Sequence, residues 1–180
     1  MDDHTLEKLK YPLGKFSNPE SVSTEEIKGY IQTIEDFPDK LIHAVFGLFD
    51  EQLDTQYRPD GWTIRQVVHH LADSHLNSYV RFKWALTEDN PTIKAYDEVL
   101  WAELEDASSA PVKVSLKLLE ALHSRWAMTL KNMSLKDFQR KFIHPETKKE
   151  ISLDTNLASY AWHCNHHLAH IVNLKQQKGW

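Results

Sequence analysis

Apolar residues recur every three or four positions in four long stretches of the chain, which is the spacing of amphipathic helices. The first stretch opens with Ser23 and Glu26, a capping-box pattern that is typical of a helix start. The second opens at Thr63, the third follows Pro111, and the last ends by Gly179. We therefore predict long helices over residues 23–48, 63–87, 111–130 and 154–179. Four such helices in a chain with few glycines and prolines predict an all-α four-helix bundle.

Three features interrupt this regular pattern. Residues 1–22 show no apolar period, so we expect an extended N-terminal arm laid over the body of the protein. Pro38 should kink or divide the first helix, because proline lacks the N–H that the helix ladder requires. Residues 142–153 carry a weak pattern for a short hairpin or loop before the last helix. Nothing divides the chain further, so we predict a single domain over residues 1–180.

Composition and charge narrow the class of protein. The 180 residues are 41% hydrophobic, which is enough for one substantial core. The net charge is -5 with both signs interspersed, which argues against a nucleic-acid partner or an anionic membrane surface. The chain shows neither a signal-peptide pattern at its start nor a membrane-spanning apolar run. A single cysteine, Cys164, suits a reducing compartment, so we expect a cytoplasmic protein.

Eleven histidines are the most unusual feature of the composition. Four of them fall in a single stretch of eight residues inside the last predicted helix. Histidines four apart on a helix point from one face, so His163 with His167, or His166 with His170, could bind one metal ion together. A third ligand must come from another helix. His69 or His70, in the second predicted helix, is the candidate.

Helical angles favour one of these pairs. At about 100° per residue, His163 and His167 border the apolar face of the last helix, whereas His166 points toward solvent. In the second helix, His69 and His70 lie at similar angles on either side of the apolar face, so the choice stays open with a weak tilt toward His70. His75 falls near the middle of that apolar face. We expect it to be a buried structural histidine.

A set of three histidines favours chemistry over a purely structural site, because it leaves coordination positions open to water or substrate. Asp73 lies one turn after His70 and is the candidate general base or outer partner of a ligand. Ser74, Asn77 and Arg81 follow on the same side and are candidates for substrate binding. The competing interpretation is that these residues are ordinary polar flanks of the core. Cys164 falls in the apolar arc of its helix, so we interpret it as core.

Three motifs resemble a known family. They are Tyr11-Pro12-Leu13-Gly14, the segment 61–74 that contains Val68-His69-His70-Leu71, and the segment 162–170 that begins Trp162-His163. The chain resembles the YfiT family of metal-dependent hydrolases within the DinB-like superfamily. The resemblance implies a DinB-like four-helix bundle, one zinc or nickel ion per subunit, a small-molecule substrate and a cytoplasmic homodimer. By position, the ligands that it implies are His70, His163 and His167.

Three functional hypotheses follow. In the first, the metal activates water against a small electrophilic substrate, as in a hydrolase. In the second, a low-molecular-weight thiol is the nucleophile, because related bundles are described as bacillithiol S-transferases, and the metal would stabilise its thiolate. In the third, the metal only stabilises the fold or a dimer. The family resemblance does not choose among them, since function resides in the site and not in the fold.

Overall fold

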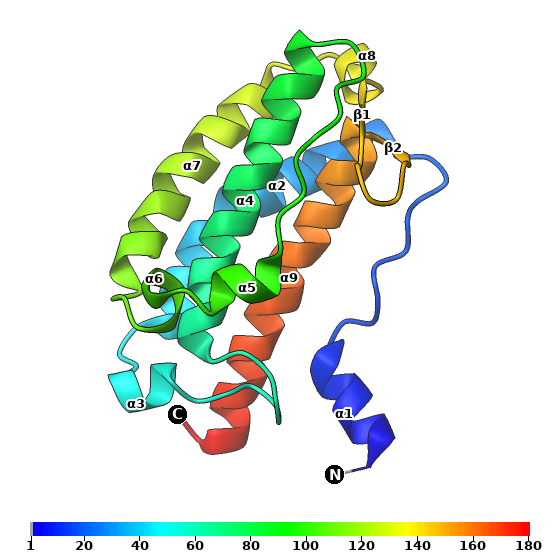
Figure 1. Cartoon of the computed structure of the whole chain (residues 1–180). Helices are drawn as coiled ribbons and strands as arrows, with labels where there is room; N and C mark the ends of the chain where they lie inside the picture. Colours follow the sequence, from blue (N-terminus) through cyan, green and yellow to red (C-terminus); the bar gives the residue numbers. More distant parts are fainter. Residues whose placement is uncertain (1) are drawn as a thin grey trace.

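A computed structural model describes residues 2–180, and four long helices form its body (Figure 1). These helices are α2 (Thr24–Val45), α4 (Ile64–Thr87), α7 (Lys113–Lys131) and α9 (Leu153–Lys178). Helix α2 packs against α7 and α9, and α4 packs against the same two helices. The helices α2 and α4, which follow one another among the four, therefore lie diagonally across the bundle. The predicted all-α four-helix bundle is confirmed.

Shorter elements surround the bundle. The strands β1 (Lys141–Ile143) and β2 (Glu150–Ser152) pair antiparallel just before α9, which confirms the predicted hairpin. Phe142 of β1 is fully buried and joins the core. The remaining short helices are α1 (Asp3–Lys10), α3 (Asp50–Leu53), α5 (Glu98–Ala102), α6 (Glu105–Ser108) and α8 (Leu135–Phe138). Of these, α5 and α6 lie against α4 in the long connection to α7 (Figure 1).

Helix α2 continues through Pro38 without a break, so the expectation that this residue could divide the helix was wrong. The buried face formed by Ile34, Phe37 and Leu41 extends to both sides of the proline, and its packing keeps the helix whole. The helix ends at Val45 and not at Leu48, just before a left-handed turn at residue 47. Because Pro38 has no N–H, the carbonyl of Ile34 lacks its usual partner within the helix.

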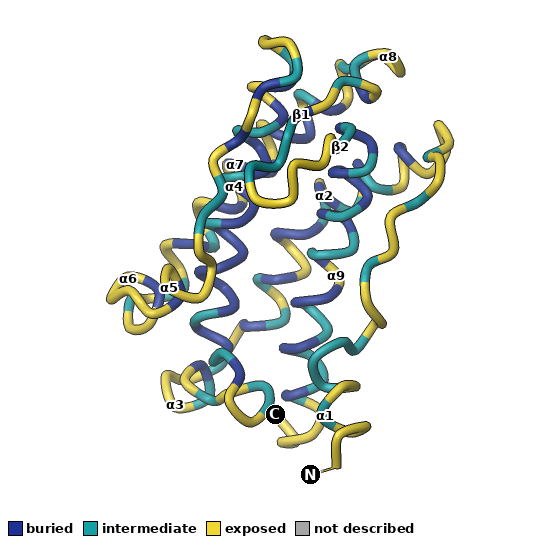
Figure 2. The backbone as a smooth tube through the Cα atoms, turned by 45° about the vertical axis from the view of Figure 1, so that its right-hand side comes forward, coloured by how far each residue is buried: buried dark blue, intermediate teal, exposed yellow. Residues whose placement is uncertain are grey.

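The N-terminal arm is not extended throughout. Residues 3–10 form α1, where the side chain of Asp2 caps the helix by accepting from the Thr5 N–H at 2.7 Å. None of the residues of α1 is buried, although Leu6 and Leu9, three positions apart, are half-buried. Figure 2 shows the arm as largely exposed, with half-buried positions where it meets α9. The arm therefore covers one face of α9, as expected, with a helix in place of extended chain.

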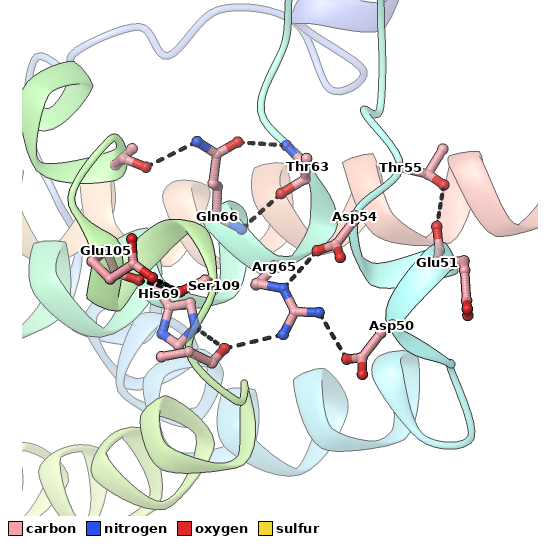
Figure 3. A network of polar contacts seen from close by, with 12 residues as sticks. Asp50, Glu51, Asp54, Thr55, Thr63, Arg65, Gln66, His69, Glu105 and Ser109 are labelled. Atoms are coloured by element: carbon pink, nitrogen blue, oxygen red, sulfur yellow. Dashed lines mark hydrogen bonds and ion pairs between the residues drawn. The ribbon is translucent and has the colours of Figure 1, made fainter.

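A polar network fixes the start of α4 to the loops around it (Figure 3). The guanidinium of buried Arg65 donates to Asp54 at 2.6 Å and to Asp50 at 2.8 Å. Its third bond, at 3.1 Å, goes to the carbonyl of Ala110. Gln66 closes a capping box with the N-cap residue Thr63. These bonds hold the first turn of α4 in place.

The core lies between the inner faces of the four helices, which are the buried positions in Figure 2. Its largest fully buried side chains include Trp126, Phe37, Phe82 and Phe142. Cys164 is also fully buried, which confirms its interpretation as core, and burial raises the pKa of its thiol well above the usual value. Within residues 2–180, no helix has both the length and the apolar character needed to cross a bilayer.

Candidate metal centre

Three histidines from two adjacent helices converge inside the bundle. His70 lies on α4, and His163 and His167 lie one turn apart on α9. One ring nitrogen from each histidine can be chosen so that all three lie within 4.8 Å of one another. Nε2 of His70 and Nε2 of His163 are 3.2 Å apart. The structure thus brings together the three residues that the family resemblance implied.

The surroundings keep these rings uncharged. Burial lowers the pKa of His70 to about 4, and it lowers the pKa values of His163 and His167 well below the usual 6.5. At neutral pH each ring therefore offers a nitrogen lone pair. Two nitrogens bound to tetrahedral zinc at about 2.0–2.1 Å lie about 3.3 Å apart, close to the separation of the His70 and His163 nitrogens. The donor set fits a divalent metal ion.

His69 points away from the three converging histidines. Its Nδ1 lies 2.7 Å from the hydroxyl of Ser115, and its Nε2 lies 3.0 Å from the carbonyl of Ala110. Both ring nitrogens are therefore engaged by α7 and the loop before it. His70, one residue later on α4, is the histidine that faces α9.

The alternative pair, His166 and His170, also lies close to His167. We expected His166 to approach solvent, but it is buried, because Trp162 stacks on it and Tyr11 of the N-terminal arm lies nearby. Nε2 of His170 contacts the carbonyl of Lys10 at 3.2 Å. The imidazole of His170 is thus engaged in fastening the arm to α9, and the set formed with His70 is the better candidate.

A cavity of about 380 Å³ opens beside the three converging histidines. All three line its wall, together with Trp62 and Trp162. The ring of Trp62 lies 4.5 Å from that of His70, measured between centroids. A small molecule in this cavity would therefore contact the candidate metal ligands directly.

The other residues selected from the sequence divide into two groups. Ser74 and Arg81 line the cavity. Asp73 and Asn77 do not appear in its wall, and the amide of Asn77 donates to the backbone carbonyl of Asp73 at 2.9 Å. Burial, with a smaller contribution from Asp106, raises the pKa of Asp73 to about 6. The functional roles assigned to these four residues stay predictions.

Sequence reasoning missed several residues of the cavity wall. Tyr96 and Glu98 come from the connection after α4, and His144 and Glu146 come from the turn between the two strands. Burial raises the pKa of Tyr96 above its usual value, so its hydroxyl stays protonated and can donate a hydrogen bond. No period or spacing marks such residues, because tertiary folding alone brings these loops over the histidines.

Comparisons with known proteins agree with this fold. The model of the DinB superfamily matches residues 33–171. The "Putative metal-dependent hydrolase YfiT" of Bacillus subtilis (strain 168) is 50% identical over 172 residues, which cover 96% of this chain and 97% of that protein. A similarly named protein of Oceanobacillus iheyensis is 51% identical over 171 residues, which cover 95% of this chain and 98% of that protein.

The solved structure of YfiT from Bacillus subtilis, which is described as having an unusual four-helix bundle topology, is similar with a TM-score of 0.94. The identity is 50%, and the match covers 96% of this chain and 99% of that one. The diagonal placement of α2 and α4 is thus the topology of a known bundle. Since these matches extend over nearly the whole chain, the protein belongs to the YfiT family of the DinB superfamily.

Proposed function

We propose that this protein is a metal-dependent hydrolase whose divalent ion is held by His70, His163 and His167. The observation that carries the proposal is the convergence of three uncharged, deeply placed imidazoles at the wall of a cavity. A structural metal site would usually have four protein ligands, whereas three leave a position for water or substrate. The names of the relatives support the same reaction class.

The metal ion, when bound, supplies Lewis acidity and lowers the pKa of a coordinated water. The protein's own residues then bind and orient the substrate. The guanidinium of Arg81 suits an anionic or oxygen-rich group, and the protonated hydroxyl of Tyr96 can donate a hydrogen bond to it. The carboxylates of Glu98 and Glu146 are available proton acceptors in the wall. A cavity of about 380 Å³ suits a small molecule.

Zinc or nickel is the proposed ion, because the family resemblance implies one of these two and imidazole ligands suit both, as they also suit copper and iron. Thiol transfer is the competing reaction, and in that case the thiol must enter with the substrate, since Cys164 is buried in the core and is not in the cavity wall.

Metal content per chain is the direct test of the ligand set. We expect about one equivalent in the wild type after zinc or nickel is supplied, almost none in His167→Ala, and wild-type content in His69→Ala. Elemental mass spectrometry on untagged protein measures this. Full occupancy in His167→Ala would overturn the ligand set. An activated-ester probe, assayed with and without an added thiol, then separates hydrolysis from thiol transfer, because only the latter needs the thiol.

A further inference from the structure

A chain of hydrogen bonds starts at His163 and crosses the whole bundle. Nδ1 of His163 lies 3.1 Å from Nε2 of His75, and Nδ1 of His75 lies 2.7 Å from Nε2 of His123. Nδ1 of His123 in turn lies 2.5 Å from the carbonyl oxygen of Ile34. The four residues come from α9, α4, α7 and α2 in that order, so each long helix contributes one. His75 and His123 are 0% and 1% exposed, so water does not compete for these bonds.

The carbonyl of Ile34, at the far end of this chain of hydrogen bonds, determines which ring nitrogen of each histidine in it carries the proton. A carbonyl oxygen can only accept, so Nδ1 of His123 carries the proton and, in a neutral ring, Nε2 carries the lone pair. That lone pair requires a proton on Nδ1 of His75. The remaining nitrogen of His75 then accepts from Nδ1 of His163. Nε2 of His163 is left with a lone pair, and this is the atom that lies 3.2 Å from Nε2 of His70.

Pro38 explains why the carbonyl of Ile34 is available. In an unbroken helix this carbonyl would accept from the N–H of residue 38, four positions later. Proline has no N–H, so the carbonyl would be a buried acceptor without a partner. His123 supplies that partner from α7. The proline in α2 thus leaves the carbonyl free and the histidine in α7 occupies it, although the two residues are far apart in the sequence.

We propose that His75 and His123 are positioning residues that, anchored on the Ile34 carbonyl, hold His163 in the Nδ1–H form so that Nε2 faces the metal ion. This inference rests on the proposed three-histidine metal centre. By contrast, Nδ1 of His167 is buried and has no hydrogen-bond partner among residues 2–180. His163 is therefore the ligand whose tautomer the core selects, and outer hydrogen bonds of this kind typically change metal affinity by about 10–100-fold.

Two substitutions at His123 separate the hydrogen-bond chain from packing. His123→Leu removes both the acceptor for His75 and the donor for Ile34, which frees His75 to turn its proton toward His163 and shift the proton of His163 to Nε2. His123→Gln keeps an acceptor oxygen and a donor amide, so it should restore the order of protons. His69→Leu is the matched control, because His69 is also a buried, doubly hydrogen-bonded histidine, but its partners are Ser115 and Ala110.

The first readout is the tautomer of His163 in metal-free protein, measured by nitrogen-15 NMR of the histidine rings. We expect Nδ1–H in the wild type, in His123→Gln and in His69→Leu, and a shift toward Nε2–H in His123→Leu. The second readout is zinc affinity, measured by competition with a chromophoric chelator. We expect His123→Leu to bind zinc about 10–100-fold more weakly, with the other two variants close to the wild type.

An unchanged tautomer and affinity in folded His123→Leu would overturn the proposal. If that variant does not fold, the wild type still decides, because a proton on Nε2 of His163 in the metal-free protein contradicts the inferred order. If the proposed metal site itself is wrong, the wild type will bind neither zinc nor nickel. The tautomer measurement needs no metal, so it would still test the hydrogen-bond chain in that case.

Discussion

The role of each buried histidine follows from what its two ring nitrogens contact. Both nitrogens of His69 are taken by Ser115 and a carbonyl, so it joins α4 to α7. Both nitrogens of His75 contact other histidines, so the tautomer of His123 sets that of His75, which in turn sets that of His163. His167 lines the cavity, and within residues 2–180 its Nδ1 has no hydrogen-bond partner. The residue type is the same in each case, and the partners decide whether it joins, orients or binds.

Arg65 provides a residue-scale prediction about stability. Arg65→Ala removes three charge-assisted bonds from the start of α4, so we expect the free energy of unfolding to fall by about 1–3 kcal/mol. The loss stays moderate because Asp50 and Asp54 remain solvated. Lys131→Ala is the control, since its pair with Glu35 is exposed and worth no more than about 1 kcal/mol. Urea denaturation measures the free energy of unfolding of both variants. An equal loss in the two would contradict the expectation that the buried Arg65 network contributes more than an exposed ion pair.

At the scale of elements, the bundle orients the candidate site through pairs of helices. Adjacent α4 and α9 supply the three converging histidines. Helices α7 and α2 contact one of them, His163, indirectly, through His123 and the Ile34 carbonyl by way of His75. The capping box at Thr63 and the Arg65 network fix the first turns of α4, on which His70 lies. The position of one ligand therefore depends on contacts in every long helix.

Pro38 gives a prediction at this scale. Pro38→Ala restores an N–H that competes with His123 for the carbonyl of Ile34. We expect zinc affinity to fall several-fold and helical content to stay unchanged. The gain in stability should be smaller than the roughly 3 kcal/mol by which alanine is favoured over proline inside a helix, because the bond to His123 weakens. Chelator competition measures the zinc affinity and urea denaturation the stability. A stability gain of the full roughly 3 kcal/mol together with unchanged zinc affinity would contradict this prediction.

At the scale of the whole molecule, an unusual number of uncharged histidines lies inside the bundle. Burial is the main cause that lowers the pKa of eight of them, and it lowers those of His70, His123, His166 and His170 to about 4. The other four are His69, His75, His163 and His167. An unfolded chain would protonate all of them near pH 6.5. Acid therefore favours unfolding.

This charge pattern predicts how stability depends on pH. Between about pH 6.5 and 4 the unfolded state binds more protons than the native state, so stability falls as the pH falls. Each fully neutral buried histidine contributes on the order of 1 kcal/mol per pH unit in this window. Urea denaturation of metal-free protein at several pH values measures the slope, and His123→Leu should show a shallower one. Equal stability at pH 7.5 and 5 would contradict the assignment of uncharged histidines.

The sequence by itself determined the four helices and the fact that His163 and His167 share one face of the last helix. Both follow from the helical period, which is a local property: apolar residues three or four apart share a face, and so do histidines four apart. The short helix α1 was not predicted, because its eight residues are too few for a helical period to stand out along the sequence.

Only the tertiary structure decided which residues of different helices meet. The period gives angles within one helix, but the rotation of one helix against another depends on packing, so His69 and His70 could not be separated from angles alone. The same limit hid the contacts of His75 with His123 and of His123 with Ile34, whose sequence separations are 48 and 89 residues. It also hid the cavity loops, because their residues follow no period and gain their place only when the bundle closes.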